Sequence, residues 1–82
     1  MNLAEANERL ETFFTFKAGW DSYSGKPISQ KAIVCAKAML FRLGDGWQPV
    51  PCSDGGVQLE GPHLGCYVEI YIDPEEGAQS HG

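Results

Sequence analysis

Hydrophobic residues recur every three or four positions near the start of the chain, with charged residues mostly between them. These apolar positions are Leu3, Ala6, Leu10, Phe13 and Phe14. The spacing predicts an amphipathic helix over residues 3–17. Asn2 and Glu5 form a capping pair at its start. Gly19 ends the helix, because a residue without Cβ adopts the left-handed conformation at least cost.

A second helix is predicted to begin after Pro27, with Ser29 as its N-cap, and to end at Gly44. One side of this helix is apolar and carries Ala32, Ile33, Ala36, Met39, Leu40 and Leu43. An alanine and methionine stripe at this spacing is typical of a core-facing helix.

After Gly46 the hydrophobic period changes to two, which predicts strands and turns. Residues 47–52 form a short strand, and Pro49 and Pro51 confine it to a sheet edge because proline has no amide hydrogen. The glycine-rich segment 54–56 is a turn.

Two longer strands follow this turn, Val57 to Glu60 and Cys66 to Asp73, and residues 61–65 join them as a five-residue hairpin loop. Their alternation gives the sheet one apolar and one polar face. The apolar face, which covers the helices, carries Val57, Leu59, Cys66, Val68, Ile70 and Ile72. The polar face carries Gln58, Glu60, Tyr67, Glu69, Tyr71 and Asp73.

The sequence therefore predicts an α+β fold in which two α-helices pack on one face of a three-stranded antiparallel β-sheet. Residues 1–74 form this single domain, and residues 75–82 form a flexible C-terminal tail.

Charge is divided unevenly along the 82 residues, whose net charge is −5. Residues 1–43 contain all six Lys and Arg residues and four acids, whereas residues 44–82 contain seven acids and no base. The acidic half is also the half predicted to form the sheet, so its charge lies on an ordered surface. Such a surface suits a basic partner and disfavours direct contact with nucleic acid, although solubility alone would also account for it.

Size and composition narrow the function further. A chain of this length buries only about 60–65% of the surface that it exposes when unfolded, which leaves little room for a deep active-site cleft. The hydrophobic fraction of 43% indicates a globular domain. The longest uncharged apolar stretch is far shorter than the roughly 20 residues that a membrane span requires. The N-terminus lacks a basic segment followed by an apolar one, so we expect a cytoplasmic protein.

The cysteines Cys35, Cys52 and Cys66 are odd in number, which argues against a disulfide framework, and we interpret them as buried thiols. Cys52, His63 and Cys66 supply three residue types of a zinc site, but no C-x-x-C pair is present, and a fourth ligand would have to come from Asp54 or elsewhere. A small zinc-binding domain or enzyme is kept as a third interpretation, while we expect no metal and no cofactor.

Catalytic motifs are also not evident. His63 lies in a predicted turn and His81 in the predicted tail, so neither belongs to a nucleophilic triad. Glu60 and Glu69 face each other across the hairpin, but on an exposed sheet face neither has a reason to hold a proton. We therefore do not expect an enzyme.

The segment from Gly19 to Lys26 has a superficial likeness to a phosphate-binding loop. Its two glycines enclose one residue too many, and proline follows the lysine in place of serine or threonine. We interpret it as a connector in which Trp20 and Tyr23 cover the open end of the core.

Two segments resemble a pattern found in small uncharacterised proteins of bacteria and their phages. One is GWDSY at residues 19–23 with PIS at residues 27–29, and the other is DGGVQLE at residues 54–60. Those proteins often have tryptophan after the glutamate, where this chain has Gly61. The resemblance covers roughly residues 15–73 and implies organisation but no activity. In size and charge the chain is also similar to anti-CRISPR proteins, which bind a CRISPR effector and block its target DNA.

These observations predict a non-enzymatic inhibitor that binds protein through the polar sheet face. We expect that face to contact a basic protein surface, such as a CRISPR effector subunit, and to exclude nucleic acid from it. The alternative is an antitoxin or regulatory partner of a bacterial two-gene module. The oligomeric state stays open.

Overall fold

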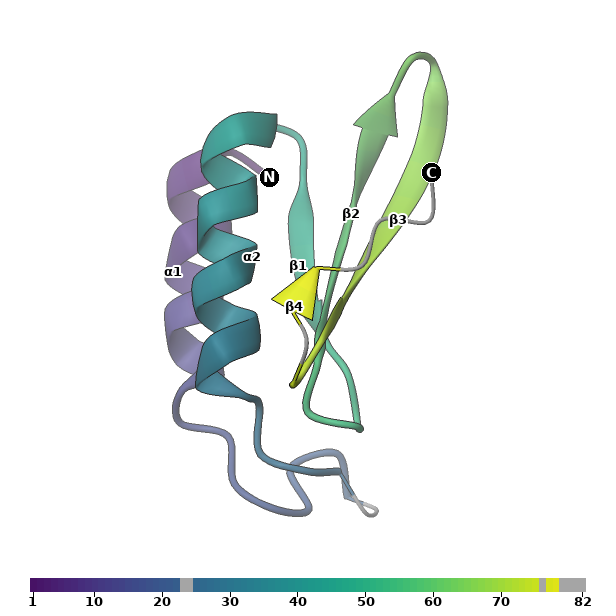
Figure 1. The fold of residues 1–82 in the computed structure, drawn as a ribbon. Coiled ribbons are helices and arrows are strands. Elements are labelled where there is room, and N and C mark those ends of the chain that lie inside the picture. The colour runs from purple at the N-terminus through teal and green to yellow at the C-terminus, as the bar shows by residue number, and fades with distance from the viewer. Residues whose placement is uncertain (23–24, 76, 79–82) are drawn as a thin grey trace.

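A pair of helices lies against one face of an antiparallel sheet in the computed structural model, which describes residues 1–22, 25–75 and 77–78 (Figure 1). The elements are α1 (Leu3–Phe13), α2 (Gln30–Leu43), β1 (Gln48–Pro51), β2 (Val57–His63), β3 (Cys66–Asp73) and β4 (Gly77–Ala78). The strands follow the order β1-β2-β3-β4, and every neighbouring pair is antiparallel. The predicted α+β class, with helices packed on a sheet of three main strands, is confirmed.

The two-residue strand β4 lies in the segment that was predicted as a tail. It extends the sheet by pairing Ala78 with Ile72 and Gly77 with Asp73. Residues 76 and 79–82 of the predicted tail lie outside the described residues.

Helix α1 has the predicted capping box but ends at Phe13, earlier than predicted. At its start the side chain of Asn2 accepts a hydrogen bond from the amide of Glu5 at 2.8 Å. Beyond Phe13 the backbone tightens, and the amide of Phe16 donates to the carbonyl of Phe13. The ring of Phe16 then lies 5.3 Å from that of Phe13 and 5.1 Å from that of Trp20. Aromatic packing thus replaces the last predicted turn of the helix.

Helix α2 begins and ends where the sequence predicts. Ser29 is its N-cap, and the Ser29 Oγ atom also donates to the carbonyl of Pro74 at 2.6 Å, which ties the start of α2 to the end of β3. Gly44 caps the other end with φ of 80°, and its amide donates to the carbonyl of Leu40. Within the described part of the chain, neither helix combines the length and apolarity that crossing a bilayer requires.

The connection between β2 and β3 differs from the prediction. Strand β2 continues to His63, which pairs with Cys66, so the predicted five-residue loop over 61–65 is a two-residue turn of Leu64 and Gly65. Both turn residues have positive φ, 51° for Leu64 and 80° for Gly65, as a type I′ hairpin turn requires. Leucine is not a residue type that marks such a turn, which is why the sequence pattern missed it.

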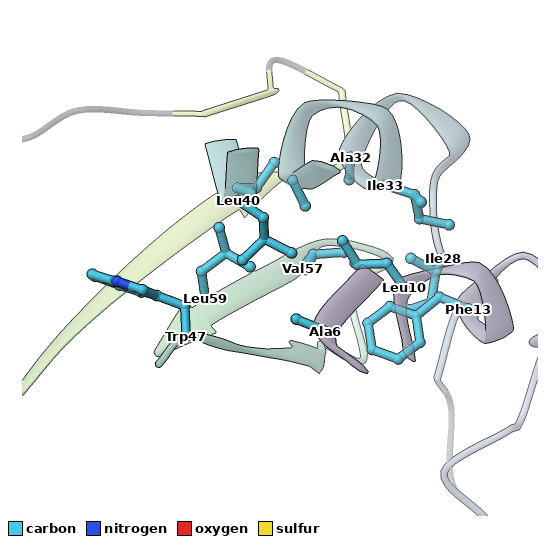
Figure 2. Packing of buried hydrophobic residues seen from close by; sticks show 12 residues of the cluster. Ala6, Leu10, Phe13, Ile28, Ala32, Ile33, Leu40, Trp47, Val57 and Leu59 are labelled. Carbon is cyan, nitrogen blue, oxygen red and sulfur yellow. The ribbon is translucent and has the colours of Figure 1, made fainter. Parts of the chain in front are cut away.

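The core lies between the helices and the apolar face of β2. Its fully buried residues with the largest side chains are Phe13, Leu10, Ile33, Leu40, Leu59, Ile72, Val57 and Pro49. Figure 2 shows Leu10 and Leu40 from the helices near Val57 and Leu59 of β2. Phe14, which the helical pattern grouped with the apolar positions of this helix, is the C-cap residue of α1 and is 42% exposed.

The cysteines are less buried than predicted. Cys35 and Cys52 are half-buried and Cys66 is exposed. Cys66 lies on the apolar face of the sheet, but it pairs with His63 at the turn end of the hairpin, which extends past the helices (Figure 1). Burial therefore rises along β3, from the exposed Cys66 to the fully buried Ile72.

The connector between the helices closes the opposite end of the core. Trp20 packs against the core, and its Nε1 atom donates to the carbonyl of Lys26 at 2.7 Å. The amide of Gly19 donates to the carbonyl of Gly25 at 2.7 Å, which closes the connector on itself. Trp20 therefore lies where the sequence predicted it, while Tyr23 is outside the described residues.

Candidate functional site

The polar face of the sheet lies on the side away from the helices. The register of β2 and β3 pairs Gln58 with Tyr71 and Glu60 with Glu69, so these residues share one face. Strand β1 adds Gln48, which pairs with Glu60. We call this surface the acidic sheet face, and its members are Gln48, Gln58, Glu60, Tyr67, Glu69, Tyr71 and Asp73.

Glu60 lies at the centre of this face and accepts hydrogen bonds from three neighbours. Its Oε1 atom accepts from the hydroxyl of Tyr67 at 3.0 Å and from Nε2 of Gln48 at 3.3 Å. Its Oε2 atom accepts from Nε2 of Gln58 at 2.9 Å. Strands β1, β2 and β3 each contribute one donor, so the carboxylate is held in one position by all three strands.

These bonds change how the groups titrate. The hydrogen bond from Tyr67, followed by those from Gln58 and Gln48, lowers the pKa of Glu60 below its ordinary value. The same carboxylate raises the pKa of Tyr67, because the bond favours the protonated phenol. Near neutral pH the site therefore presents a fixed carboxylate and a fixed neutral tyrosine.

Glu60 and Glu69 occupy directly opposed positions on the two strands. Counting from the hairpin turn, this pair is of the non-hydrogen-bonded type, in which side chains come closest. Two like charges placed opposite each other destabilise a sheet. A cationic group placed between the two carboxylates would relieve that repulsion.

Tyr71 is held by a second carboxylate, that of Asp54 in the turn before β2. The hydroxyl of Tyr71 donates to Oδ2 of Asp54, and Oδ1 of Asp54 accepts from the amide of Gly56 at 2.8 Å. The bond to Asp54 raises the pKa of Tyr71 well above its ordinary value. One aspartate thus holds both the turn and the tyrosine ring.

Both tyrosines remain accessible although their hydroxyls are held. Tyr67 is 65% exposed and Tyr71 is 36% exposed. Their rings lose little further freedom on binding, because the hydroxyl bonds already restrict them. Rigid aromatic surface beside carboxylates is a composition that suits protein recognition.

The structure brings most of the predicted site residues together. Gln58, Glu60 and Tyr67 are joined directly, and Glu69 and Tyr71 lie across from two of them. Asp73 lies at the end of β3, half-buried, where its Oδ1 atom accepts from the amide of Glu75 at 2.8 Å. Asp73 therefore supports the turn after β3 and extends the negative charge of the face.

Two contributors were not recognised from the sequence. Gln48 was assigned to an edge strand without a role, although alternation from the buried Pro49 would have placed it on the acidic sheet face. Asp54 was recognised as a turn residue and as a possible zinc ligand, but not as a partner of the sheet face. No sequence signal indicates its bond to Tyr71, since that contact depends on how the turn folds back over β3.

The three residues proposed for a zinc site are not brought together. His63 and Cys66 lie at the turn end of the hairpin, whereas Cys52 follows β1 at the opposite end of β2. The described residues contain no cluster of three metal-ligating side chains. Burial, followed by the charges of Asp54 and Glu60, raises the pKa of the Cys52 thiol, so little thiolate forms there at neutral pH.

Comparison of the chain with protein-family models, with curated proteins and with solved structures finds no match.

Proposed function

We propose that the protein is a non-enzymatic inhibitor that uses the acidic sheet face to occupy a basic, nucleic-acid-binding surface of another protein. The observation that supports this most strongly is the opposed pair of Glu60 and Glu69, flanked by Tyr67 and Tyr71. An Arg or Lys side chain of a partner that approaches such a pair can bind both carboxylates at once. The exposed tyrosine rings add contact area and cation–π attraction.

The mode of action follows from charge. A surface that binds nucleic acid carries Lys and Arg side chains that neutralise phosphates. Carboxylates held in fixed positions compete for the same side chains and leave no room for the nucleic acid. A CRISPR effector, which holds nucleic acid in a positively charged channel, is a target of this kind.

The alternative is an antitoxin or regulatory partner in a bacterial two-gene module. It would use the same face on a basic partner, so the identity of the partner separates the two functions. We place the inhibitor first because an ordered row of carboxylates and tyrosines is suited to a channel that otherwise holds an extended polyanion.

The test is an affinity capture from bacterial lysate at low and high salt, with three forms of the protein. Wild type should retain a basic protein that is lost at high salt. Glu69→Lys should lose that protein. Glu75→Lys, which changes the net charge equally at an exposed position after β3, should retain it. Equal retention by both variants would remove the acidic sheet face from consideration.

The captured protein is then assayed for nucleic-acid binding with increasing amounts of the inhibitor. Displacement of the nucleic acid by wild type, but not by Glu69→Lys, is the result that we expect. Capture of a single toxin-like protein whose nucleic-acid binding is unaffected would support the antitoxin function instead.

A further inference from the structure

The outer surface of the helix pair carries apolar side chains that the core does not use. Phe41 is 73% exposed, Val34 is 60% exposed and Phe14 is 42% exposed. Val34 and Phe41 are two helical turns apart and share one stripe of α2. Phe14, the C-cap residue of α1, lies beside this stripe, because the Nζ atom of Lys37 is 5.9 Å from the centre of its ring. We call Phe14, Val34 and Phe41 the apolar strip, and exposed strips of this kind mark interaction sites.

The two helices flank the apolar strip with opposite charge. Helix α2 contains three bases and no acid, and its Lys31 and Arg42 are exposed on one side of the strip. Helix α1 contains three acids and one base; its Glu5 and Glu8 are exposed on the other side, with the single base Arg9 exposed beside them, so that this flank is acidic on balance. The outer surface therefore runs from basic, through apolar, to acidic.

We propose that this surface is the interface of a homodimer. A two-fold axis that runs parallel to the helices and passes through the apolar strip places the apolar strip of one protomer against the same strip of the other. The same axis places the basic flank of each protomer on the acidic flank of the other. Helix α1 of one protomer then lies antiparallel on α2 of the other, in the arrangement of a four-helix bundle.

The register of the helices agrees with this pairing. Glu11 and Lys37 form an ion pair within one chain, so they lie at the same height along the helix pair. Counting one turn toward the start of α1 and one turn toward the end of α2 places Glu8 level with Leu40. Since rotation about a parallel axis preserves height, Arg42 of one protomer comes within reach of Glu8 of the other.

Charge complementarity favours a second copy over other occupants. A different protein would need an acidic and a basic surface on either side of an apolar one, spaced as the two flanks of the apolar strip are spaced. A second copy of this chain has that arrangement. An anionic membrane would attract the side of Lys31 and Arg42 but repel that of Glu5 and Glu8. The dimer leaves both acidic sheet faces exposed, so it goes beyond the proposed function and does not depend on it.

Sedimentation equilibrium of the full chain over a range of concentrations tests the dimer. Wild type should sediment as a dimer in rapid equilibrium with monomer. Phe41→Asp should raise the dissociation constant at least about a hundredfold, with an unchanged circular dichroism spectrum because Phe41 is exposed. A wild-type monomer at every concentration, or a Phe41→Asp variant that dimerises as wild type does, would overturn the proposal.

A charge swap tests the register. Arg42→Glu alone and Glu8→Arg alone should each raise the dissociation constant about tenfold at low salt, and the double variant should recover most of the loss. Glu69→Lys, on the acidic sheet face, should leave the dissociation constant unchanged. If the two single-variant increases in the dissociation constant simply combined in the double variant, that result would contradict the antiparallel pairing of α1 with α2.

Discussion

The indole ring of Trp47 lies directly against the backbone of Gly61. A Cβ atom at Gly61 would lie 2.4 Å from Cδ2 of Trp47 and 2.7 Å from its Cγ, far closer than nonbonded carbon atoms approach. Trp47 is only 3% exposed and belongs to the core. The absence of a side chain at Gly61 therefore lets the tryptophan close the core where β1 begins (Figure 2).

Gly61→Ala should consequently destabilise the fold by about 2 kcal/mol, because the ring or the strand must move to admit the methyl group. Urea unfolding measures this change. In a Trp47→Leu background the same substitution should cost much less, which a double-mutant cycle detects. An equal cost in both backgrounds would show that the contact with Trp47 is not the cause.

Leu64→Asn should stabilise the protein by about 1 kcal/mol. Leu64 has φ of 51° and is 90% exposed, so it bears the strain of the left-handed conformation without the benefit of burial. Asparagine tolerates this conformation at the first position of a type I′ turn. The midpoint of chemical unfolding should rise, and a midpoint equal to or below that of wild type would contradict the strain.

The contribution of Glu60 to stability should depend on pH. Because its pKa is lower in the folded chain than in the unfolded one, the contribution is present above the unfolded pKa, about 4.3, and is lost as pH falls through the folded pKa. Tyr67→Phe removes the strongest donor, so the pKa of Glu60 should rise toward its ordinary value. An NMR titration of the Glu60 carboxyl group measures both values, and an unchanged pKa in Tyr67→Phe would exclude this bond as the cause.

Tyr71 should show the opposite dependence. Its pKa is raised by the bond to Asp54, so its contribution to stability is present below the ordinary pKa, about 10, and is lost as pH rises through the folded pKa. Asp54→Asn keeps the Oδ1 acceptor for Gly56 but removes the charge. The variant should ionise Tyr71 at lower pH, as followed by NMR of its ring, and ionisation at the wild-type pH would be evidence against the contact.

The local features of the fold could be read from the sequence. Each helix end depends on contacts between residues that are three or four positions apart in the sequence. These ends are the capping box at Asn2, the N-cap at Ser29 and the C-cap at Gly44. The alternation along β3 placed Tyr67 and Glu69 on the correct faces, since the two-residue period of a strand is a property of its backbone. Fold class and the β2 and β3 members of the acidic sheet face followed from these short-range rules.

Other features depended on contacts between distant residues. The turn at Leu64 closes because strands β2 and β3 pair on both sides of it, and this pairing overrides the conformational preference of leucine. Cys66 lies on the apolar face yet stays exposed because the helices do not reach the turn end of the hairpin.

The same distinction applies to the candidate site. Alternation predicted which residues of β2 and β3 share a face, but not that Gln48 of β1 donates to Glu60 or that Asp54 holds Tyr71. Those bonds require a particular register between β1 and β2 and a particular path of the turn that joins them.

The sequence by itself thus determined the elements and their faces, since these depend on neighbours along the chain. Only the tertiary structure decided which side chains meet, since that depends on how the elements are placed against one another.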